Sequence, residues 1–213
     1  MSIAQNIVQL KQQLPSNVLL VAVSKTKPNE MLLEAYEAGQ LDFGENYVQE
    51  LVDKHDSLPK EIRWHFIGHL QSNKVKYIAP FVYLIHGVDS FKLLKEINKE
   101  AIKNNRTIKC LLQIYIATEE TKFGLSFDEA TDLLTSSEFL EFKNITIEGF
   151  MAMASNTDDE MQIRKEFKAL YNFKMQFPEY KILSTGMSSD YRIAIEEGST
   201  LIRVGSKIFG ERN

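Results

Sequence analysis

The sequence contains one cysteine and four histidines among its 213 residues. A single cysteine cannot form a disulfide within the chain, and Cys110 lies in the apolar run 110–116. We therefore expect a buried thiol in a reducing compartment and predict a cytoplasmic location. His65 and His69 have the spacing of two zinc ligands on a helix, but a predicted strand end and Gly68 separate them. So few soft ligands argue against a zinc site, and no metal is predicted.

Long apolar runs and an excess of basic residues are also missing. No run approaches the ~18 residues of a membrane span, and the first residues lack the cationic and apolar regions of a signal peptide. Lysine and arginine together number 25 against 29 aspartates and glutamates, a net charge of −4, which argues against a nucleic-acid or membrane partner. The sequence has no Gly-x-Gly-x-x-Gly after its first strand, no Walker-type loop and no Gly-x-Ser-x-Gly elbow.

What is present is a regular alternation of strand and helix patterns. Short apolar runs predict eight strands, at residues 18–23, 41–44, 64–68, 82–88, 109–116, 145–153, 181–184 and 201–204. Amphipathic patterns predict helices at residues 1–14, 29–38, 91–104, 127–134, 159–177 and 190–197, with two more after residue 46 and before residue 79. Asn46 and Gln49 have the spacing of a capping box for the helix that follows them.

Eight strands alternating with helices, without a linker or a break in composition, predict an α/β protein with a single (β/α)₈ TIM barrel over residues 1–213. An open doubly wound sheet would show the same alternation. We prefer the barrel because the strand count is eight and the N-terminal helix could cover the bottom or the last gap. A bare barrel needs at least ~200 residues, so almost nothing is left for a second domain.

Lys25 stands where the first predicted strand leaves the sheet. Residues 18–23 are all apolar and predict a strand buried on both faces, and Pro28 forces a turn soon after. In parallel α/β folds, such strand ends form the mouth where ligands bind. Lys25 is either an ordinary surface lysine or a partly desolvated amine of lowered pKa that can form a Schiff base. Lys27, on the same face if the chain stays extended, would lower that pKa further. Arg203 would add a permanently protonated donor to this mouth, unless it is a surface or ion-paired arginine.

Two loops near the C-terminus have the composition of a phosphate site. Residues 184–190 follow the seventh strand and open a helix, whose free backbone N–H groups suit a phosphate, although Ser188, Ser189 and Asp190 could simply cap the helix. The eighth strand is followed by Gly205, which allows close backbone approach, and by Ser206, which adds a hydroxyl. Barrels commonly build a phosphate site from the loops after strands seven and eight, so the two loops support one another.

Five segments of the sequence resemble motifs of the pyridoxal 5′-phosphate homeostasis protein family: residues 22–28 (AVSKTKP), 43–50 (FGENYVQE), 64–74 (WHFIGHLQSNK), 186–190 (GMSSD) and 202–210 (IRVGSKIFG). The resemblance runs from about residue 3 to the C-terminus, and the segment 64–74 is specific enough to be a family signature. It implies the barrel of the alanine racemase N-terminal domain, fold type III, without the second, β-rich domain of the racemase.

The resemblance also implies which residues contact pyridoxal 5′-phosphate (PLP): Lys25, Asn46, Ser188, Arg203, Gly205 and Ser206. Lys25 would form a Schiff base with the cofactor, Arg203 would face its pyridine nitrogen, and Asn46 would line the pocket. The other three would hold the phosphate. The serine at position 206, where the family often has threonine, keeps the hydroxyl. The segment 118–124 matches only loosely, through Lys122 and Gly124, and no role is assigned to it.

Two functions of different classes fit this resemblance. The first is a binding and carrier protein, not an enzyme, that holds PLP and passes it to PLP-dependent apo-enzymes. The second is a PLP-dependent amino-acid racemase. A protonated Arg203 leaves the pyridine nitrogen unprotonated and makes the ring a weaker electron sink. A racemase of this fold draws its second acid/base group from an additional domain that this chain lacks. A Schiff-base aldolase would use Lys25 without a phosphate cup. We therefore predict the carrier, acting as a cytoplasmic monomer.

Overall fold

The computed structural model describes residues 2–119 and 122–211, and its sheet is a closed barrel of eight parallel strands in sequence order. The strands are β1 (Leu19–Val23), β2 (Asp42–Glu45), β3 (Arg63–Phe66), β4 (Leu84–Val88), β5 (Ile108–Gln113), β6 (Ile145–Met151), β7 (Ile182–Ser184) and β8 (Leu201–Val204). Strand β1 pairs with β8 from Leu19 opposite Leu201 to Ala22 opposite Val204. This pairing closes the sheet, so the predicted barrel is confirmed and the open sheet is excluded.

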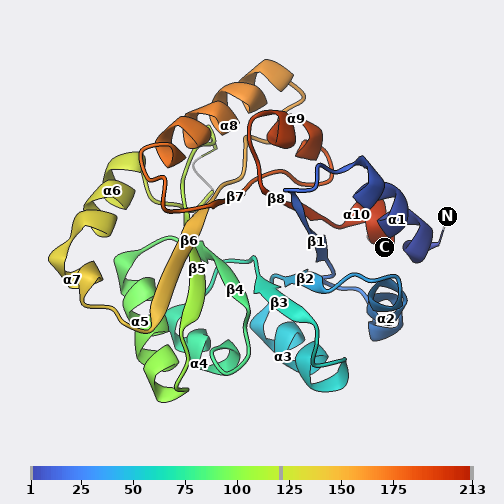
Figure 1. Cartoon of the computed structure of the whole chain (residues 1–213), viewed down its shortest axis with the longest axis horizontal. Helices are drawn as coiled ribbons and strands as arrows, with labels where there is room; N and C mark the ends of the chain where they lie inside the picture. Colours follow the sequence, from blue (N-terminus) through green and yellow to red (C-terminus); the bar gives the residue numbers. More distant parts are fainter. Residues whose placement is uncertain (1, 120–121, 212–213) are drawn as a thin grey trace.

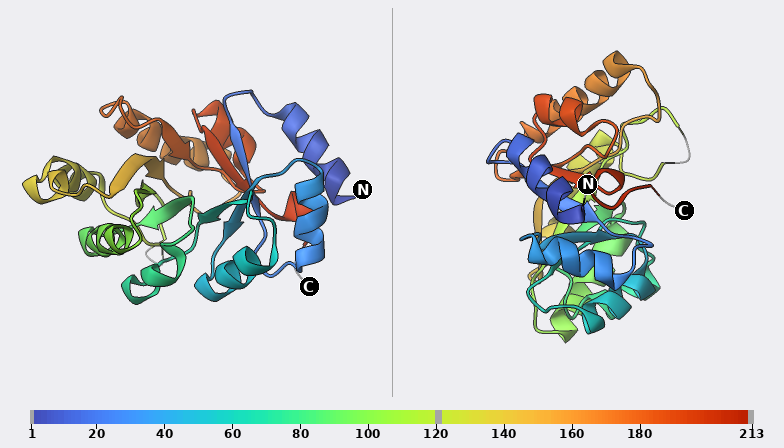
Figure 2. Two further views of the ribbon diagram at one scale, coloured as in Figure 1. Left: turned by 60° about the horizontal axis from the view of Figure 1, so that its bottom comes forward. Right: turned by 90° about the vertical axis from the view of Figure 1, so that its right-hand side faces the viewer.

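Helices surround the barrel on its outside (Figure 1). They are α1 (Ile3–Gln13), α2 (Asn29–Glu37), α3 (Val48–Ser57), the 3₁₀ helix η1 (Ser72–Lys74), α4 (Val75–Ile78), α5 (Phe91–Lys103), α6 (Phe127–Thr135), α7 (Ser137–Leu140), α8 (Glu160–Lys174), α9 (Tyr191–Glu196) and α10 (Ser206–Phe209). Helix α1 packs against α2 and α10, and Asn6 donates its side-chain N–H to the Ile208 carbonyl. The N-terminal helix therefore covers the last gap, beside the very short α10 (Figures 1 and 2).

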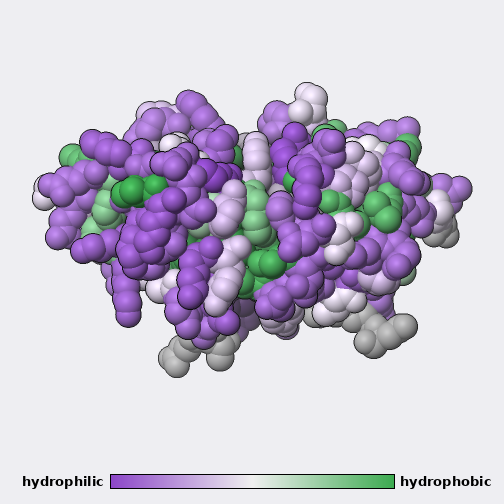
Figure 3. All heavy atoms as spheres, turned by 90° about the horizontal axis from the view of Figure 1, so that it is seen from below, coloured by the Kyte–Doolittle hydropathy of each residue, from purple (hydrophilic) through white to green (hydrophobic). Residues whose placement is uncertain are grey.

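Apolar side chains form three separate clusters, of which the smallest packs α8 against α9 through Ile163, Phe167 and Ala194. The largest lies between the sheet and the ring of helices and includes Phe43, Trp64 and Phe150. The second lies inside the barrel and consists of Val21, Leu84, Leu111, Met151 and Leu201. Burial on both sides explains why the strands read as continuous apolar runs. The outer surface that carries α3, α4 and α5 is predominantly hydrophilic, with small apolar patches (Figure 3). None of the helices described here combines the length and the apolar character needed to cross a bilayer.

The predicted capping box at Asn46 and Gln49 is wrong. Helix α3 begins at Val48, and its N-cap is Tyr47, which makes no side-chain capping bond. The Asn46 side chain instead lines a cavity, and the Gln49 amide donates to Asp53 at 2.9 Å. The spacing of a capping box is a local pattern, whereas the β2 loop places Asn46 against β3. Gly68 lies so close to the Asn46 carbonyl that a Cβ there would come within 2.3 Å.

Three strands end earlier than their apolar runs predict, and one of them is β3, which stops at Phe66 rather than at residue 68. Strand β5 stops at Gln113 and β6 at Met151, although Ile114 and Ala152 beyond them are buried. Ile114 forms only an isolated bridge with Leu125. Hydrophobicity records burial, and a loop that passes over the barrel mouth can be as buried as a strand, so the pattern overestimates strand length here.

Candidate functional site

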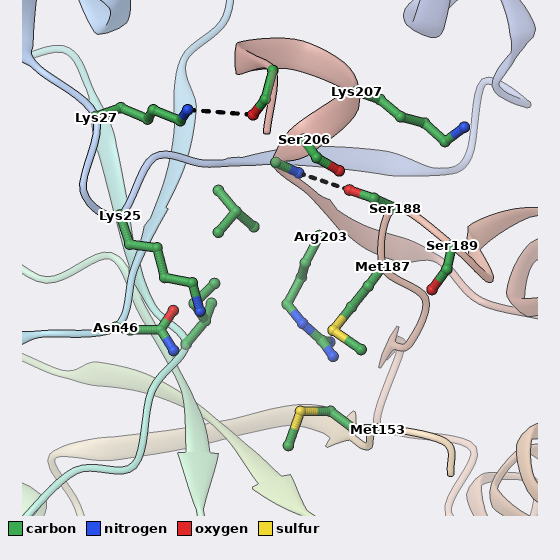
Figure 4. Close-up of a pocket in the computed structure, with 14 residues that line it drawn as sticks. Lys25, Lys27, Asn46, Met153, Met187, Ser188, Ser189, Arg203, Ser206 and Lys207 are labelled. Carbon is green, nitrogen blue, oxygen red and sulfur yellow. Dashed lines mark hydrogen bonds between the residues drawn. The ribbon is translucent and has the colours of Figure 1, made fainter. Parts of the chain in front are cut away.

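A cavity of about 550 Å³ opens at the carboxyl ends of the strands. Its lining includes all six residues predicted as a site: Lys25, Asn46, Ser188, Arg203, Gly205 and Ser206. They come from the ends of β1, β2, β7 and β8, so the barrel brings together residues as much as 181 positions apart (25 to 206). Val23, Ile67, Met153 and Met187 supply apolar walls. Figure 4 shows the Lys25 and Arg203 side chains extending into the pocket, with Met187 and Met153 on the Arg203 side.

Lys25 leaves β1 on a turn rather than on an extended segment. Thr26 has a φ of 64°, a left-handed conformation that β-branched residues rarely adopt. Lys27 is therefore turned away from Lys25, and its Nζ donates to the carbonyl oxygens of Gly210 at 3.3 Å and Glu211 at 2.9 Å. The prediction that Lys25 and Lys27 share one face along an extended chain is wrong, although both line the cavity.

Arg203 is buried, and its guanidinium donates hydrogen bonds to residues at the ends of β6 and β7. Nη1 donates to the Ser184 carbonyl at 2.8 Å and to the Ser184 hydroxyl at 2.6 Å, and Nη2 donates to the Ala152 carbonyl at 3.1 Å. Burial lowers the pKa of Arg203 to about 10, against the opposing effect of Asp190. The side chain is still protonated at neutral pH, so the prediction of a cation at the mouth agrees with the geometry.

Two buried histidines continue this support down the barrel interior. The Ser184 hydroxyl lies 3.0 Å from His86 Nδ1, His86 Nε2 lies 2.9 Å from His65 Nδ1, and His65 Nε2 lies 3.0 Å from Asp42 Oδ1. Burial lowers the pKa of both histidines, most strongly that of His86. With both rings neutral, each hydrogen bond in the series holds one proton, donated stepwise from Arg203 toward Asp42.

Sequence reasoning missed this series of side chains. It considered His65 only as a zinc ligand paired with His69, whereas His69 lies outside the barrel beside Asp89 at 3.1 Å. Within residues 2–119 and 122–211, no three histidine, cysteine or acidic side chains are grouped to hold a metal ion. The available signal was a polar residue inside a fully apolar strand pattern, as at His65 in β3 and His86 in β4.

The two loops proposed to hold a phosphate meet at the cavity. Ser188 accepts a hydrogen bond on its hydroxyl from the Gly205 N–H at 3.2 Å, which leaves its own O–H free to be donated. Asp190 accepts at 2.6 Å from the Met187 N–H and makes no side-chain bond to cap α9. Ser206 begins α10 directly after Gly205. Ser188 thus faces the β8 loop, which favours the ligand-binding interpretation of this loop over the capping one.

Asn46 completes the site on the β2 side. Its Oδ1 is buried and has no hydrogen-bond partner within the described residues, an arrangement that costs free energy unless a donor arrives from elsewhere. Figure 4 shows this amide beside the Lys25 side chain. The cavity thus combines an amine, a buried guanidinium, serine hydroxyls and an unsatisfied acceptor, a set suited to an anionic polar ligand carrying an electrophile.

Comparison with known proteins identifies relatives of this chain. The family profile of the alanine racemase N-terminal domain matches residues 1–213. A pyridoxal phosphate homeostasis protein of Vibrio alginolyticus is 38% identical over 231 residues, covering 100% of this chain and 98% of the relative. The pyridoxal phosphate homeostasis protein of Homo sapiens is 40% identical over 213 residues, covering 91% of this chain and 76% of the relative.

Solved structures share the fold of this chain. PipY of Synechococcus elongatus, determined with PLP bound, superposes with a TM-score of 0.89 at 34% identity and covers 98% of this chain and 100% of its own. Alanine racemase of E. faecalis has a TM-score of 0.77 at 16% identity, a likeness of fold alone, and this chain covers 58% of its length.

Proposed function

The chain belongs to the pyridoxal phosphate homeostasis protein family, whose fold is that of the alanine racemase N-terminal domain, and from this premise we propose that it binds PLP and delivers it to PLP-dependent apo-enzymes. The observation that carries the proposal is the convergence of Lys25, Arg203 and the serine loops on one cavity. PLP-bound PipY, 34% identical, supports the choice of ligand.

The residues of the cavity fit PLP in size, charge and chemistry. A cavity of about 550 Å³ lies within the range of small-molecule sites. The Ser188 and Ser206 hydroxyls and the Gly205 loop would hold the phosphate, Arg203 would face the pyridine nitrogen, and Asn46 Oδ1 would gain the donor that it lacks. The Met153 and Met187 side chains supply apolar surface for a flat ring.

Lys25 supplies the covalent attachment in this proposal. With PLP bound, the Lys25 amine would be the group that holds its aldehyde, as a Schiff base. When bound, the cofactor supplies an aldehyde that this amine can hold and release reversibly. Such a bond retains PLP firmly and still permits exchange with an incoming amine, which is the behaviour a carrier needs.

The composition of the cavity favours a carrier over a racemase. Racemisation removes the α-proton on one face and returns it on the other, so it needs two acid/base groups. Among the described residues that line the cavity there is no histidine, tyrosine, cysteine or carboxylate. Of the lysines there besides Lys25, Lys27 is bound to two carbonyl oxygens and Lys207 lies over the Tyr191 ring at 5.7 Å. Arg203, protonated at neutral pH, leaves the pyridine nitrogen unprotonated and weakens carbanion stabilisation.

The test measures two activities of the protein: delivery of PLP to an apo-enzyme, and racemisation of free amino acids. Pure PLP-loaded protein should restore activity to an apo-enzyme that requires PLP. Incubated with alanine, serine or a basic amino acid, it should racemise them far below the ~10 s⁻¹ of a median enzyme, because acid–base assistance typically contributes 10²–10⁴ in rate. Chiral chromatography measures the second quantity. Racemisation near the median rate that Lys25→Ala abolishes would replace the carrier with a racemase.

A further inference from the structure

A cluster of one lysine and two glutamates, of which Lys54 and Glu45 are buried and Glu50 is partly exposed, contacts the turn that carries Lys25. Lys54, on α3, donates from Nζ to Glu45 Oε1 at 2.8 Å, to Glu50 Oε1 at 2.6 Å and to the Ser24 carbonyl at 2.8 Å. Glu45 is completely buried, and Lys54 is 5% exposed. None of the three lines the cavity, so the cluster acts on the site only through the residues that it holds.

The cluster forms hydrogen bonds with both residues adjacent to Lys25 in the chain, Ser24 and Thr26. Ser24 donates its hydroxyl to Glu45 Oε1 at 2.6 Å and gives its carbonyl to Lys54. Thr26 donates its backbone N–H to Glu50 Oε1 at 2.6 Å. Thr26 is the residue with a φ of 64°, and a β-branched residue keeps such a conformation only when its surroundings impose it. The bond to Glu50 supplies that restraint.

The same cluster connects Lys25 to Asn46. Glu45 is the last residue of β2 and immediately precedes Asn46. Ser24 also donates its N–H to the Gly44 carbonyl at 3.0 Å. The loops after β1 and β2, which carry the amine and the unsatisfied amide of the cavity, are therefore fixed to each other by one set of polar contacts.

Stability alone is a poor explanation for this cluster. Lys54 and Glu45 lose hydration on burial, Glu50 keeps 21% of its side chain exposed, and well-packed apolar side chains in place of such a cluster are often as stable or more so. Burial raises the pKa of Glu45 in spite of the neighbouring Lys54, so the desolvation cost outweighs the attraction at this carboxyl. What the cluster provides that apolar side chains cannot is directional bonds to the Ser24 carbonyl and the Thr26 N–H.

We infer that Lys54, together with Glu45 and Glu50, is a positioning residue that fixes the turn around Lys25 so that its amine faces the bound electrophile. The inference rests on the proposed function, because it assigns to Lys25 the covalent attachment of PLP. Loss of the cluster should impair covalent attachment specifically and leave the noncovalent recognition of phosphate and ring largely intact.

The experiment compares PLP with pyridoxine 5′-phosphate, which carries an alcohol in place of the aldehyde and cannot form the Schiff base. Lys54→Met should raise the Kd for PLP by about tenfold or more, because the Lys25 amine is no longer held facing the aldehyde. The Kd for pyridoxine 5′-phosphate should change by less than about threefold. The matched control is Lys103→Met, which leaves Glu100 (7% side-chain exposure) without its lysine on α5 and should change neither Kd.

A second pair of variants covers a failure of Lys54→Met to fold. Glu50→Ala should speed hydrogen exchange at the Thr26 amide in the ligand-free protein and weaken PLP binding, whereas Glu50→Gln keeps an acceptor for that amide and should retain most of both. Equal weakening of the two ligands in Lys54→Met, or no difference between Glu50→Ala and Glu50→Gln, would overturn the inference. If Lys25→Ala itself leaves the Kd for PLP unchanged, the proposed function fails instead.

Discussion

Arg203 is buried near the barrel mouth and His86 lies below it, and removal from water lowers the pKa of both side chains. The two side chains differ in protonation at pH 7 because the ordinary pKa of arginine is much higher than that of histidine. Arg203, at about 10, keeps its proton at pH 7, whereas burial holds His86 neutral. A neutral His86 can accept the Ser184 proton on Nδ1, so Ser184 can in turn accept from Arg203.

This protonation pattern predicts a loss of stability in mild acid. The unfolded chain binds protons on His65 and His86 near pH 6.5, and the folded chain binds them only at lower pH. Their contribution to stability is thus complete above about pH 6.5 and is lost as the pH falls toward the folded pKa values. The slope approaches about 1.4 kcal/mol per pH unit for each histidine. The raised pKa of Glu45 acts in the opposite direction.

Urea denaturation between pH 7 and pH 5 measures this slope. His86→Gln, which cannot titrate, should have a smaller slope than the wild-type protein, with Glu45 contributing equally to both. An identical slope in the two proteins would mean that His86 does not control the acid response.

At the scale of elements, the barrel mouth depends on close approach between strand ends. A Cβ at Gly68 would lie 2.3 Å from the Asn46 carbonyl, and a Cβ at Gly87 would lie 2.6 Å from the Gly68 carbonyl. Glycine at these positions lets the segments that follow β2 and β3, and β4 itself, crowd together. That crowding sets where Asn46 can lie.

Gly68→Ala should therefore displace Asn46 and weaken PLP binding as well as stability. Gly39→Ala provides the control, since a Cβ there meets nothing within 4 Å but must adopt a φ of +83°, which costs roughly 1 kcal/mol. We expect both variants to unfold at lower denaturant concentration and only Gly68→Ala to raise the Kd for PLP. Unchanged binding by Gly68→Ala would show that the position of Asn46 is not critical.

The sequence predicted the helices and strands far better than the caps and turns that connect them. Periodicity marks long helices such as α5 well, because it reflects which face is buried, and a continuous apolar run marks the short buried strand β8. It could not show that Tyr47 rather than Asn46 precedes α3, or that Thr26 turns left-handed. Those features depend on contacts with distant residues such as Gly68 and Glu50. Helices α7 and α10, four residues each, are too short for a periodic signal.

Whole-molecule topology explains why the candidate site was easier to predict than its support. A closed parallel barrel places every strand's carboxyl end at one mouth, so residues at those ends were expected to meet, and Lys25, Arg203 and Ser206 do line one cavity. The side chains that support these cavity residues do not line the cavity themselves. His65 and His86 occupy the interior, and Lys54 lies on α3. Their roles follow from three-dimensional proximity that no local sequence pattern records.

The central claim is that Lys25, at the end of β1, is the residue that holds PLP. Borohydride reduction of the loaded protein converts the Schiff base to a stable secondary amine, and mass mapping of proteolytic peptides then locates the label. We expect modification at Lys25 and none in Lys25→Ala. A label on Lys27 or Lys122 in the wild-type protein would contradict the assignment of Lys25.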